Sequence, residues 1–444
     1  MNTHLKKTAI HFFFLSSVFC SINLRAQVAH PDTYTSKKEY TTEIKKIASN
    51  KTVKRAFQTI LDLEQETTQH HILLTEIPAP PFKEMERAKK FAEMIKEAGA
   101  DSVWIDNVGN VIALRRGTSG GKRVVLEGHM DTVFPEGVDV TVKHRGDTLY
   151  APGIGDDTRA LAMLLTIVKS MEKAGLETKA DVLFIGTVGE EGQGDLRGVK
   201  NLFSEQGPGK IDSYIAIDGG PIGGITHRGL GSHRYRITFH GPGGHSSGAF
   251  GTANPHNALG RAIHYWAEAA DKFSREKGVR VTYNVGVIGG GTSVNSIPFE
   301  SWMEVDMRSE SPERVTETDR LLHEAVQKAL AEENKMKQTG PDLTVDMKLI
   351  GDRPSGGNDP NLPLVQRAMA TAEYLGAKPR LGVSSTNSNT PISLGVPAVT
   401  IGRGGKGGNS HALNEWYLNE NGYLAINQAL LLLLAEAGLS APSI

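Results

Sequence analysis

The chain has 444 residues, of which 39% are apolar and 22% are charged. These values are ordinary for a globular enzyme of roughly two or three domains, and they exclude a collagen-like, coiled-coil or disordered protein. The formal net charge is -1, so no strong positive field favours nucleic acid or an anionic membrane as a partner.

Residues 1–27 have the pattern of a cleaved signal peptide. Lys6 and Lys7 form a basic region, residues 9–19 form an apolar core, and Ala26 is a small residue suited to a cleavage site. The apolar core is shorter than the ~20 residues that a membrane span needs. The sequence therefore predicts a secreted or periplasmic protein without a membrane-spanning segment.

Cysteine chemistry is not expected in the mature chain. The only cysteine, Cys20, lies inside the predicted signal peptide. Cleavage would leave a protein with no disulfide and no thiol nucleophile. Any metal ion in the mature protein must then be bound by histidine and carboxylate side chains.

From residue 53 to about residue 226 the chain alternates predicted helices and strands, after a loose polar lead-in over residues 28–52. Helices are predicted over residues 53–74, 84–98 and from Thr158 onward, and strands over residues 102–105, 108–114, 123–126, 181–186 and 214–217. Because short apolar strands alternate with helices, we expect an α/β fold with a mostly parallel sheet and helices on both faces.

The pattern changes after residue 226, where strands and helices follow a β-α-β-β-α-β order. Strands are predicted over residues 233–239, 280–288, 301–306 and 343–349, and helices over residues 255–273 and 312–335. This order describes a compact sheet with helices on one face. We therefore predict an inserted α+β domain over residues 227–350.

The α/β pattern resumes after the insertion, so the first domain is split into residues 28–226 and 351–444. A helix is predicted over residues 364–375 and a strand over residues 396–401. The leucine-rich run 429–435 is too short for a membrane span and is expected to lie in an amphipathic C-terminal helix.

Five motifs with histidine or acidic side chains each follow a predicted strand or open a predicted helix. They are Gly128-His129-Met130-Asp131, Gly155-Asp156-Asp157, Glu190-Glu191, Asp218 and His411. Each motif alone has an ordinary interpretation, such as a helix cap at Asp156 and Asp157 or a solvated turn at the two glutamates. Together they would lie at the carboxyl edge of one sheet, where open α/β sheets bind their ligands.

Two histidines and three carboxylates in these motifs suit a pair of zinc ions with one bridging carboxylate. The candidate ligands are His129, Asp156, Asp218, His411 and one glutamate of the pair Glu190 and Glu191. Adjacent glutamates project to different sides of an extended chain, so one of them can bind metal while the other takes a proton from water. Asp131 could orient the ring of His129.

In these motifs the sequence resembles the M20 family of zinc peptidases and amidohydrolases, over nearly the whole mature chain. The resemblance implies two Zn2+ ions, with Co2+ or Mn2+ as possible substitutes, and Asp156 as the bridging ligand. It also implies that His129, Asp156, Glu191, Asp218 and His411 are the metal ligands and that Glu190 is the general base that activates a metal-bridging water. The peptide bond between Asp156 and Asp157 is expected to be cis.

The inserted segment resembles the lid domain of that family, which commonly mediates dimerisation. His245, within the run 243–246, matches a lid histidine that reaches the active site of the partner subunit. Asn295 and Arg308 match lid positions that contact substrate. The resemblance therefore implies a homodimer with catalytic His245 and substrate-binding Asn295 and Arg308. The ordinary alternatives are a plain loop histidine and a surface arginine.

Aspartate rather than glutamate at residue 218 resembles the peptidase T and dipeptidase branches. The predicted function is therefore hydrolysis of amide bonds in short peptides, in the manner of an aminopeptidase or a di- or tripeptidase. The alternatives are an N-acyl amino acid deacylase or carboxypeptidase G-like amidohydrolase, and a peptidase-like binding module. The glycine-rich run 402–408 either offers backbone N–H groups to a substrate carboxylate or is a flexible loop.

Overall fold

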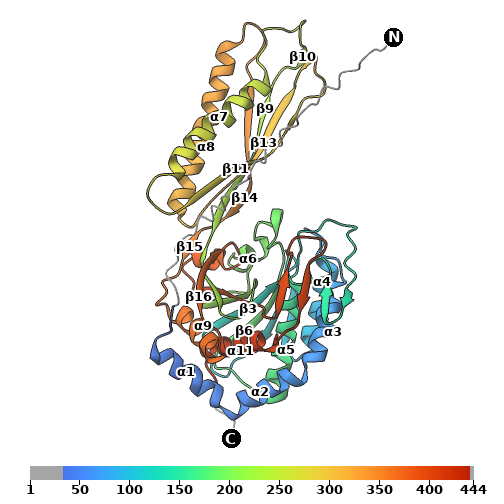
Figure 1. The fold of residues 1–444 in the computed structure, drawn as a ribbon, viewed down its shortest axis with the longest axis vertical. Helices are drawn as coiled ribbons and strands as arrows, with labels where there is room; N and C mark the ends of the chain where they lie inside the picture. The colour runs from blue at the N-terminus through green and yellow to red at the C-terminus, as the bar shows by residue number, and fades with distance from the viewer. Residues whose placement is uncertain (1–33, 441–444) are drawn as a thin grey trace, which may run out of the picture. The chain divides into compact units, whose positions relative to one another are not determined.

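The computed structural model describes residues 34–440, so the predicted signal peptide lies outside the described residues. The strands of the central sheet are β1 (Ser102–Ile105), β2 (Val111–Arg115), β3 (Arg123–His129), β6 (Asp181–Thr187), β7 (Ser213–Ile217), β8 (Gly224–Gly229), β15 (Gly356–Gly357), β16 (Arg380–Ser384) and β17 (Ala398–Ile401). They follow the order β1-β2-β6-β3-β7-β17-β8-β15, with β16 beside β8. Strands β3, β6, β15 and β16 of this sheet are labelled in Figure 1.

The centre of this sheet is parallel. Strands β6, β3, β7 and β17 run in the same direction, whereas β1, β2 and β15 pair antiparallel toward the edges. The carboxyl ends of the four central strands therefore meet at one edge, as predicted for a ligand site. The expected α/β class is confirmed.

Helices cover both faces of the central sheet. A hydrophobic core lies on each face, and one core is larger than the other. The helices that pack in the larger core are α1 (Lys38–Ser49), α2 (Lys51–Asp62), α3 (Glu64–Thr75), α4 (Met85–Glu97), α5 (Thr158–Ala174), α9 (Pro363–Tyr374) and α11 (Tyr423–Ala437). The helices that pack in the smaller core are α6 (Arg197–Leu202) and α10 (Asn389–Ser393). Side chains alternate along each strand, so Val124 and Leu126 enter the larger core while Val125 enters the smaller one.

The N-terminal segment differs from its prediction. Residues 38–49 form helix α1 instead of a loose lead-in, because Ile44 and Ala48 are one helical turn apart and are buried in the larger core. Arg367 of α9 also binds Glu43, at 3.0 Å. The single helix predicted over residues 53–74 is two helices, with a break at Leu63.

The C-terminal helix α11 is buried on all sides rather than amphipathic. Residues 425–435 are all buried, and they pack in the larger core against neighbouring helices and the sheet. A helix that is apolar around its whole surface is typical of such a central position. None of the described helices is both long and apolar enough to cross a bilayer.

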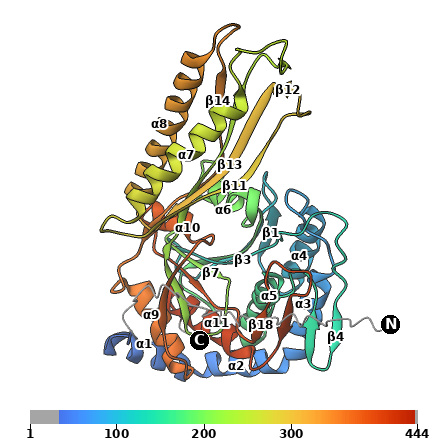
Figure 2. The ribbon, with the colours of Figure 1, turned by 45° about the horizontal axis from the view of Figure 1, so that its top comes forward.

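A second sheet forms the inserted domain, here called the lid. Its strands are β9 (Gly231–His240), β11 (Val281–Gly290), β13 (Glu300–Ser309) and β14 (Thr344–Arg353), in the antiparallel order β11-β13-β9-β14. Helices α7 (Pro255–Ser274) and α8 (Pro312–Met336) lie side by side on one face (Figure 2). The predicted elements of the lid are confirmed, while the exact boundaries at residues 227 and 350 stay predictions.

Two smaller sheets complete the described fold. Strands β4 (Lys143–Arg145), β5 (Thr148–Tyr150), β18 (Lys406–Gly408) and β19 (Trp416–Leu418) form one, and β10 (Gly244–His245) and β12 (Ser296–Ile297) form the other, at the lid tip. A short 3-10 turn covers Gly192–Gly194. The glycine-rich run 402–408 is thus partly in strand β18, which pairs with β19, rather than a free loop.

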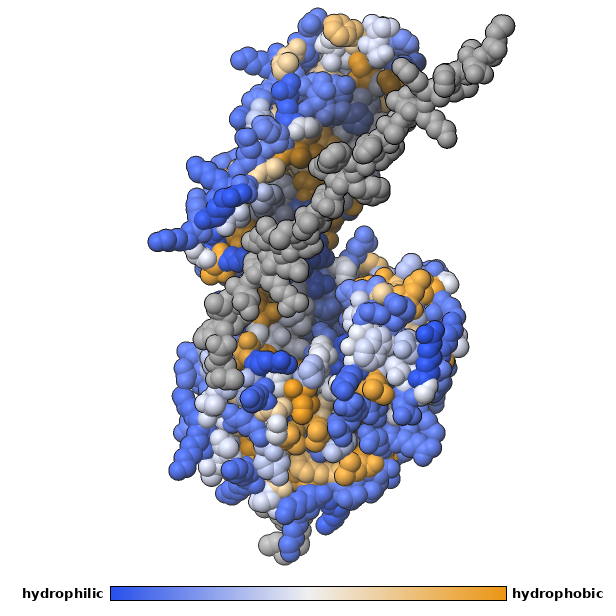
Figure 3. Space-filling view, in the orientation of Figure 1, coloured by the Kyte–Doolittle hydropathy of each residue, from blue (hydrophilic) through white to orange (hydrophobic). Residues whose placement is uncertain are grey.

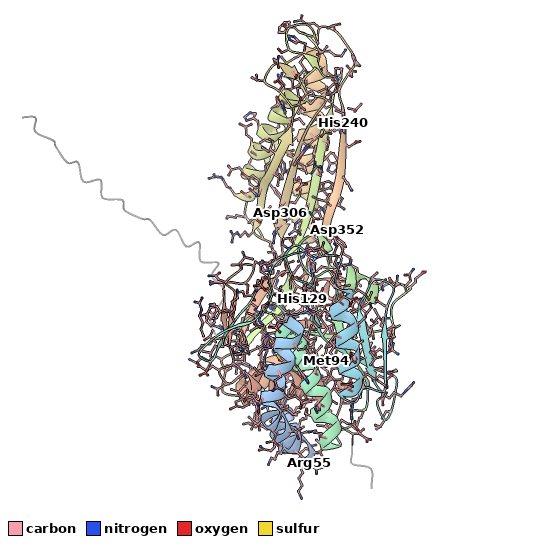
Figure 4. All side chains as sticks on the ribbon, turned by 90° about the vertical axis from the view of Figure 1, so that its right-hand side faces the viewer. Arg55, Met94, His129, His240, Asp306 and Asp352 are labelled. Carbon is pink, nitrogen blue, oxygen red and sulfur yellow. The ribbon has the colours of Figure 1, made fainter. Side chains whose placement is uncertain are left out.

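Polar contacts join the lid to the catalytic domain. The backbone N–H of Asp352 donates to Asp195 at 2.8 Å, and Arg234 donates to the carbonyl oxygen of Gly192 at 3.2 Å. Asp352 and Asp306 lie at the lid end nearest to His129 (Figure 4). These contacts place one end of the lid sheet beside the residues that follow strand β6.

Candidate metal centre and active site

Two histidines converge on one aspartate at the carboxyl edge of the central sheet. Asp156 Oδ1 lies 3.0 Å from His129 Nε2, and Asp156 Oδ2 lies 3.4 Å from His411 Nε2. His411 Nε2 also lies 2.8 Å from Glu191 Oε1. Asp156 therefore faces both histidines with different oxygen atoms, which is the arrangement expected of a bridging ligand.

The donor atoms fit a divalent metal ion. One ligand atom from each of His129, Asp156 and Glu191 lies within 4.8 Å of the others. Imidazole nitrogen and carboxylate oxygen are donors that zinc and similar ions accept. Asp218 lines the same cavity as Asp156, Glu191 and His411, and His129 contacts Asp156, so all five predicted ligands are close together. Their individual roles as ligands stay predictions.

Tight packing between β3 and α5 places His129 beside the Asp156–Asp157 turn. A Cβ atom on Gly128 would lie 2.6 Å from the Cβ of Ala160, so only glycine allows this approach. The backbone N–H of His129 then donates to Asp157 Oδ2 at 3.2 Å. The Asp156–Asp157 peptide bond is cis, as the family resemblance implied.

Asp131 contacts three neighbouring residues of the centre. Its backbone carbonyl lies 3.0 Å from His129 Nδ1, whereas its carboxylate is 3.7 Å from that nitrogen. The carboxylate instead accepts the backbone N–H groups of Glu190, at 3.0 Å, and Glu191, at 2.8 Å. Asp131 thus holds the backbone of the two adjacent glutamates, in addition to facing the His129 ring.

Glu190 is buried beside a cation. Arg353 Nη1 donates to Glu190 Oε1 at 3.3 Å and to Ser385 Oγ at 3.0 Å, and Nη2 donates to the Glu190 backbone carbonyl. Burial raises the pKa of Glu190 well above its ordinary value, Arg353 opposes this shift, and the neighbouring Glu191 adds to it. A carboxyl group in this environment can both accept and return a proton.

The carboxylates favour protonated histidines when no metal is bound. Burial opposes a charge on His129, but Asp131 and Asp156 outweigh it and raise the pKa of His129 well above 6.5. Contacts with Asp156 and Glu191 raise the pKa of His411 to about 10. The excess negative charge at the centre is the cause of both shifts.

A cavity of about 550 Å³ opens beside the candidate ligands. Its wall includes Glu190 and three arginines, which are Arg234, Arg308 and Arg353. Asp306 accepts hydrogen bonds from Nε of Arg234 and of Arg308, each at 2.8 Å. The predicted substrate residue Arg308 is therefore at the site, on a positively charged wall of the cavity.

His245 and Asn295 are not brought to this centre. They lie in or beside β10 and β12 at the lid tip, and both side chains are exposed. Strand β9 leads from the lid junction at Gly231 to His240 over 10 residues, which spans about 30 Å at ~3.3 Å per residue. Figure 4 shows the resulting separation between His240 and His129.

Sequence reasoning missed three buried side chains at the centre. Arg353 holds Glu190, and Arg403 Nη1 lies 3.5 Å from Asp218 Oδ1. Glu415 accepts the backbone N–H groups of Gly155 and Asp156, at 2.8 and 2.9 Å. The sequence signals for Arg353, Arg403 and Glu415 were weak. Each is a single charged residue that lies near a glycine, a proline or a metal-ligand motif but belongs to no motif of its own.

Comparisons with known proteins identify the family to which the chain belongs. A family model described as peptidase family M20/M25/M40 matches residues 125–436. Succinyl-diaminopimelate desuccinylase from Corynebacterium glutamicum is 25% identical over 341 residues, which cover 74% of this chain and 86% of that protein. Carboxypeptidase G2 from a Pseudomonas species is 25% identical over 310 residues, which cover 65% of this chain and 69% of that protein.

The fold is shared with solved peptidase structures. A tripeptidase from Staphylococcus aureus superposes with a TM-score of 0.68 at 22% sequence identity, covering 84% of this chain and 99% of that chain. The fold and the clustered histidine and carboxylate side chains define a hydrolase of the metallopeptidase and amidohydrolase class. The chain belongs to peptidase family M20/M25/M40, which confirms the resemblance drawn from its motifs.

Proposed function

We propose that this protein hydrolyses amide bonds in short peptides at a centre of two zinc ions. The observation that carries the proposal is Asp156, whose two carboxylate oxygens face His129 and His411 separately. Glu191 and Asp218 complete the proposed ligand set, with one histidine and one of these carboxylates for each ion. Cobalt or manganese are possible substitutes.

Bound zinc would supply a Lewis acid and would lower the pKa of water at the centre. Glu190 is the general base in this proposal, because it lines the cavity and its pKa is raised by burial. Asp131 holds the Glu190 backbone and Arg353 holds the Glu190 side chain. Glu190 takes a proton from the attacking water and returns it to the amine that leaves.

The arginines suggest which end of the substrate lies beside Glu190. Arg308 uses Nε to bind Asp306, and its terminal nitrogens have no hydrogen-bond acceptor among residues 34–440. A guanidinium fork suits a carboxylate. We propose that Arg308 binds the carboxylate of the departing amino acid, which favours short peptides with a free C-terminus.

The test uses one dipeptide in free, N-acetylated and C-terminally amidated forms, assayed with zinc or cobalt and then with a chelator. We expect chelator-sensitive cleavage of the free form and a much lower kcat/KM for the amide. Arg308→Met should lower kcat/KM for the free form by about 10–100-fold, the effect of losing a charged hydrogen bond, and change the amide little.

Other outcomes identify the alternatives. Cleavage of the N-acetylated form alone would contradict the peptidase assignment and support a deacylase or carboxypeptidase, the chemistry that two relatives carry in their names. Absence of cleavage with any form and metal would contradict an enzymatic role. Equal losses for the free and amidated forms in Arg308→Met would contradict carboxylate binding.

We also propose a homodimer in which the lid of each subunit supplies His245 and Asn295 to the other. Within one chain these residues are at the lid tip, far from the candidate ligands. Exposed apolar residues on the lid include Ile288, Val294 and Phe299. Apolar surface is also visible among hydrophilic residues on the lid in Figure 3. Such residues are suited to contact with a second copy.

The dimer proposal predicts complementation. His245→Ala and Glu190→Gln chains should each be nearly inactive alone, but a mixed dimer contains one site with Glu190 from one chain and His245 from the other. Refolding the two chains together should therefore restore activity, with chromatography showing a dimer. A mixture that dimerises and stays inactive would contradict exchange of His245.

We also propose that the protein is exported through the predicted signal peptide. N-terminal sequencing of the exported chain tests this part of the proposal.

A further inference from the structure

A second buried arginine faces the metal centre, beside Asp218 rather than beside Glu190. Arg403 is 8% exposed, and its Nη1 lies 3.5 Å from Asp218 Oδ1, 3.7 Å from Asp156 Oδ1 and 3.8 Å from Asp157 Oδ1. None of these separations is a hydrogen bond, and Nη1 has no hydrogen-bond partner in the described chain. Arg403 therefore attracts three carboxylates electrostatically without a hydrogen bond from Nη1 to any of them, so their oxygen lone pairs remain available.

The backbone around Arg403 is held in place by its neighbours. A Cβ atom on Gly402 would lie 2.4 Å from the carbonyl oxygens of Gly220 and Pro221. Gly404 has a φ of 70°, and a Cβ there would lie 2.5 Å from the Cβ of Ala425. Only glycine fits on both sides of Arg403, so tight packing fixes the backbone from which the Arg403 side chain extends.

The charge balance explains why a cation is needed here. Asp157 is buried and Asp156 and Asp218 are partly buried beside it, so their like charges are poorly screened by water and repel each other. Without metal, protonated His129 forms an ion pair with Asp156 but with neither Asp157 nor Asp218. Among residues 34–440, Arg403 is the one cation that lies within 3.8 Å of all three carboxylates. When a divalent ion binds to the same carboxylates, Arg403 becomes a positive charge close to that ion, and the two repel each other.

We propose that Arg403 is a resident counter-charge of the metal centre, which stabilises the empty centre and weakens the binding of the metal. This inference rests on the metal-binding part of the proposed function. It follows that the ligands are already in place before the metal ion binds. The affinity for the ion is also lower than the same ligands would have without Arg403.

The test is a thermodynamic cycle on the purified chain, with Arg403→Met to remove the charge and Arg403→Lys to keep it. Thermal unfolding is measured after chelation and at saturating zinc, and affinity is measured by zinc titration against a competing chelator. We expect metal-free Arg403→Met to unfold at a clearly lower temperature than the metal-free wild-type protein, and the loss of stability to be smaller when both are saturated with zinc. Arg403→Met should also bind zinc at least about tenfold more tightly, which corresponds to about 1.4 kcal/mol. The unfolding temperatures and the zinc affinity of Arg403→Lys should remain close to those of the wild-type protein.

Arg159→Met is the matched control, because Arg159 is also buried in the catalytic domain but forms no ion pair within residues 34–440. It should lower the metal-free and zinc-saturated unfolding temperatures equally and leave zinc affinity unchanged.

Two outcomes would overturn the proposal. Equal losses in both metal states for Arg403→Met would make Arg403 a structural residue only. Weaker zinc binding by Arg403→Met would mean that Arg403 orients the ligands rather than opposing the ion. Failure of the unchanged protein to bind zinc would contradict the proposed function itself, and is distinguished by the titration of that protein.

Discussion

Replacing Glu190 with Gln is expected to lower kcat by about 10²–10⁴-fold, the usual contribution of a general base. Glutamine keeps the shape of the side chain and can still accept the hydrogen bond from Arg353, which in the native protein spans 3.3 Å. It cannot take a proton from water. The loss should therefore fall on kcat with little change in KM, in steady-state kinetics with the dipeptide that the native enzyme cleaves best.

The adjacent glutamate provides a matched control. Glu191→Gln removes a proposed ligand, 2.8 Å from His411, and should lose metal, whereas Glu190→Gln should keep the metal content of the native chain. Elemental analysis of both purified variants separates the two roles. A Glu190→Gln enzyme with near-native kcat would mean that another group acts as the base.

Removal of Asp156 is expected to have the largest effect on metal binding. Asp156→Ala deletes the one side chain that faces both His129 and His411. Loss of an outer-shell partner weakens a metal site by about 10–100-fold, so loss of a bridging ligand should exceed about 100-fold and reduce the content of both ions. Asp346→Ala, at an exposed aspartate of the lid, should change neither quantity. Retention of both ions by Asp156→Ala would contradict the bridging role.

Metal binding should also depend on pH with a definite sign. Because nearby carboxylates raise the pKa of His129 and raise that of His411 to about 10, both rings carry a proton at neutral pH when the metal is absent. Zinc must displace these protons. Affinity should therefore rise with pH between about 6 and 8, and zinc addition to a weakly buffered solution should release protons. An affinity that does not change with pH would contradict the assignment of these histidines.

Local signals were enough for most of the regular elements. Apolar runs and helix-breaking residues gave the strands around His129 and Asp218 and both lid helices, because each signal is contained in a few neighbouring residues. The errors lie where packing decides. The sequence of α1 is mostly polar and predicts a loose lead-in, but in the structure Ile44 and Ala48 pack in the core shared with α9 and α11. The sequence of α11 predicts an amphipathic helix, but in the structure its polar residues are buried as well.

The candidate site divides in the same way. The five proposed ligands and Glu190 could be named because a motif marks each of them, directly after a strand or at the start of a helix. Arg353 and Arg403 could not, because their importance lies in contacts of 3.3 and 3.5 Å with Glu190 and Asp218, residues that are distant in sequence. The same holds for the Asp131 carboxylate, which binds the backbone of Glu190 and Glu191 as well as facing His129.

By itself the sequence determined the α/β class, the inserted lid, the family and the candidate ligands, because these depend on periodicity and on short motifs. Only the tertiary structure decided which cations offset the clustered carboxylates and where the lid residues lie. Burial and charge pairing depend on long-range contacts that no local pattern contains. The separation of His245 from His129 is one such result, and it makes the second subunit part of the proposed function.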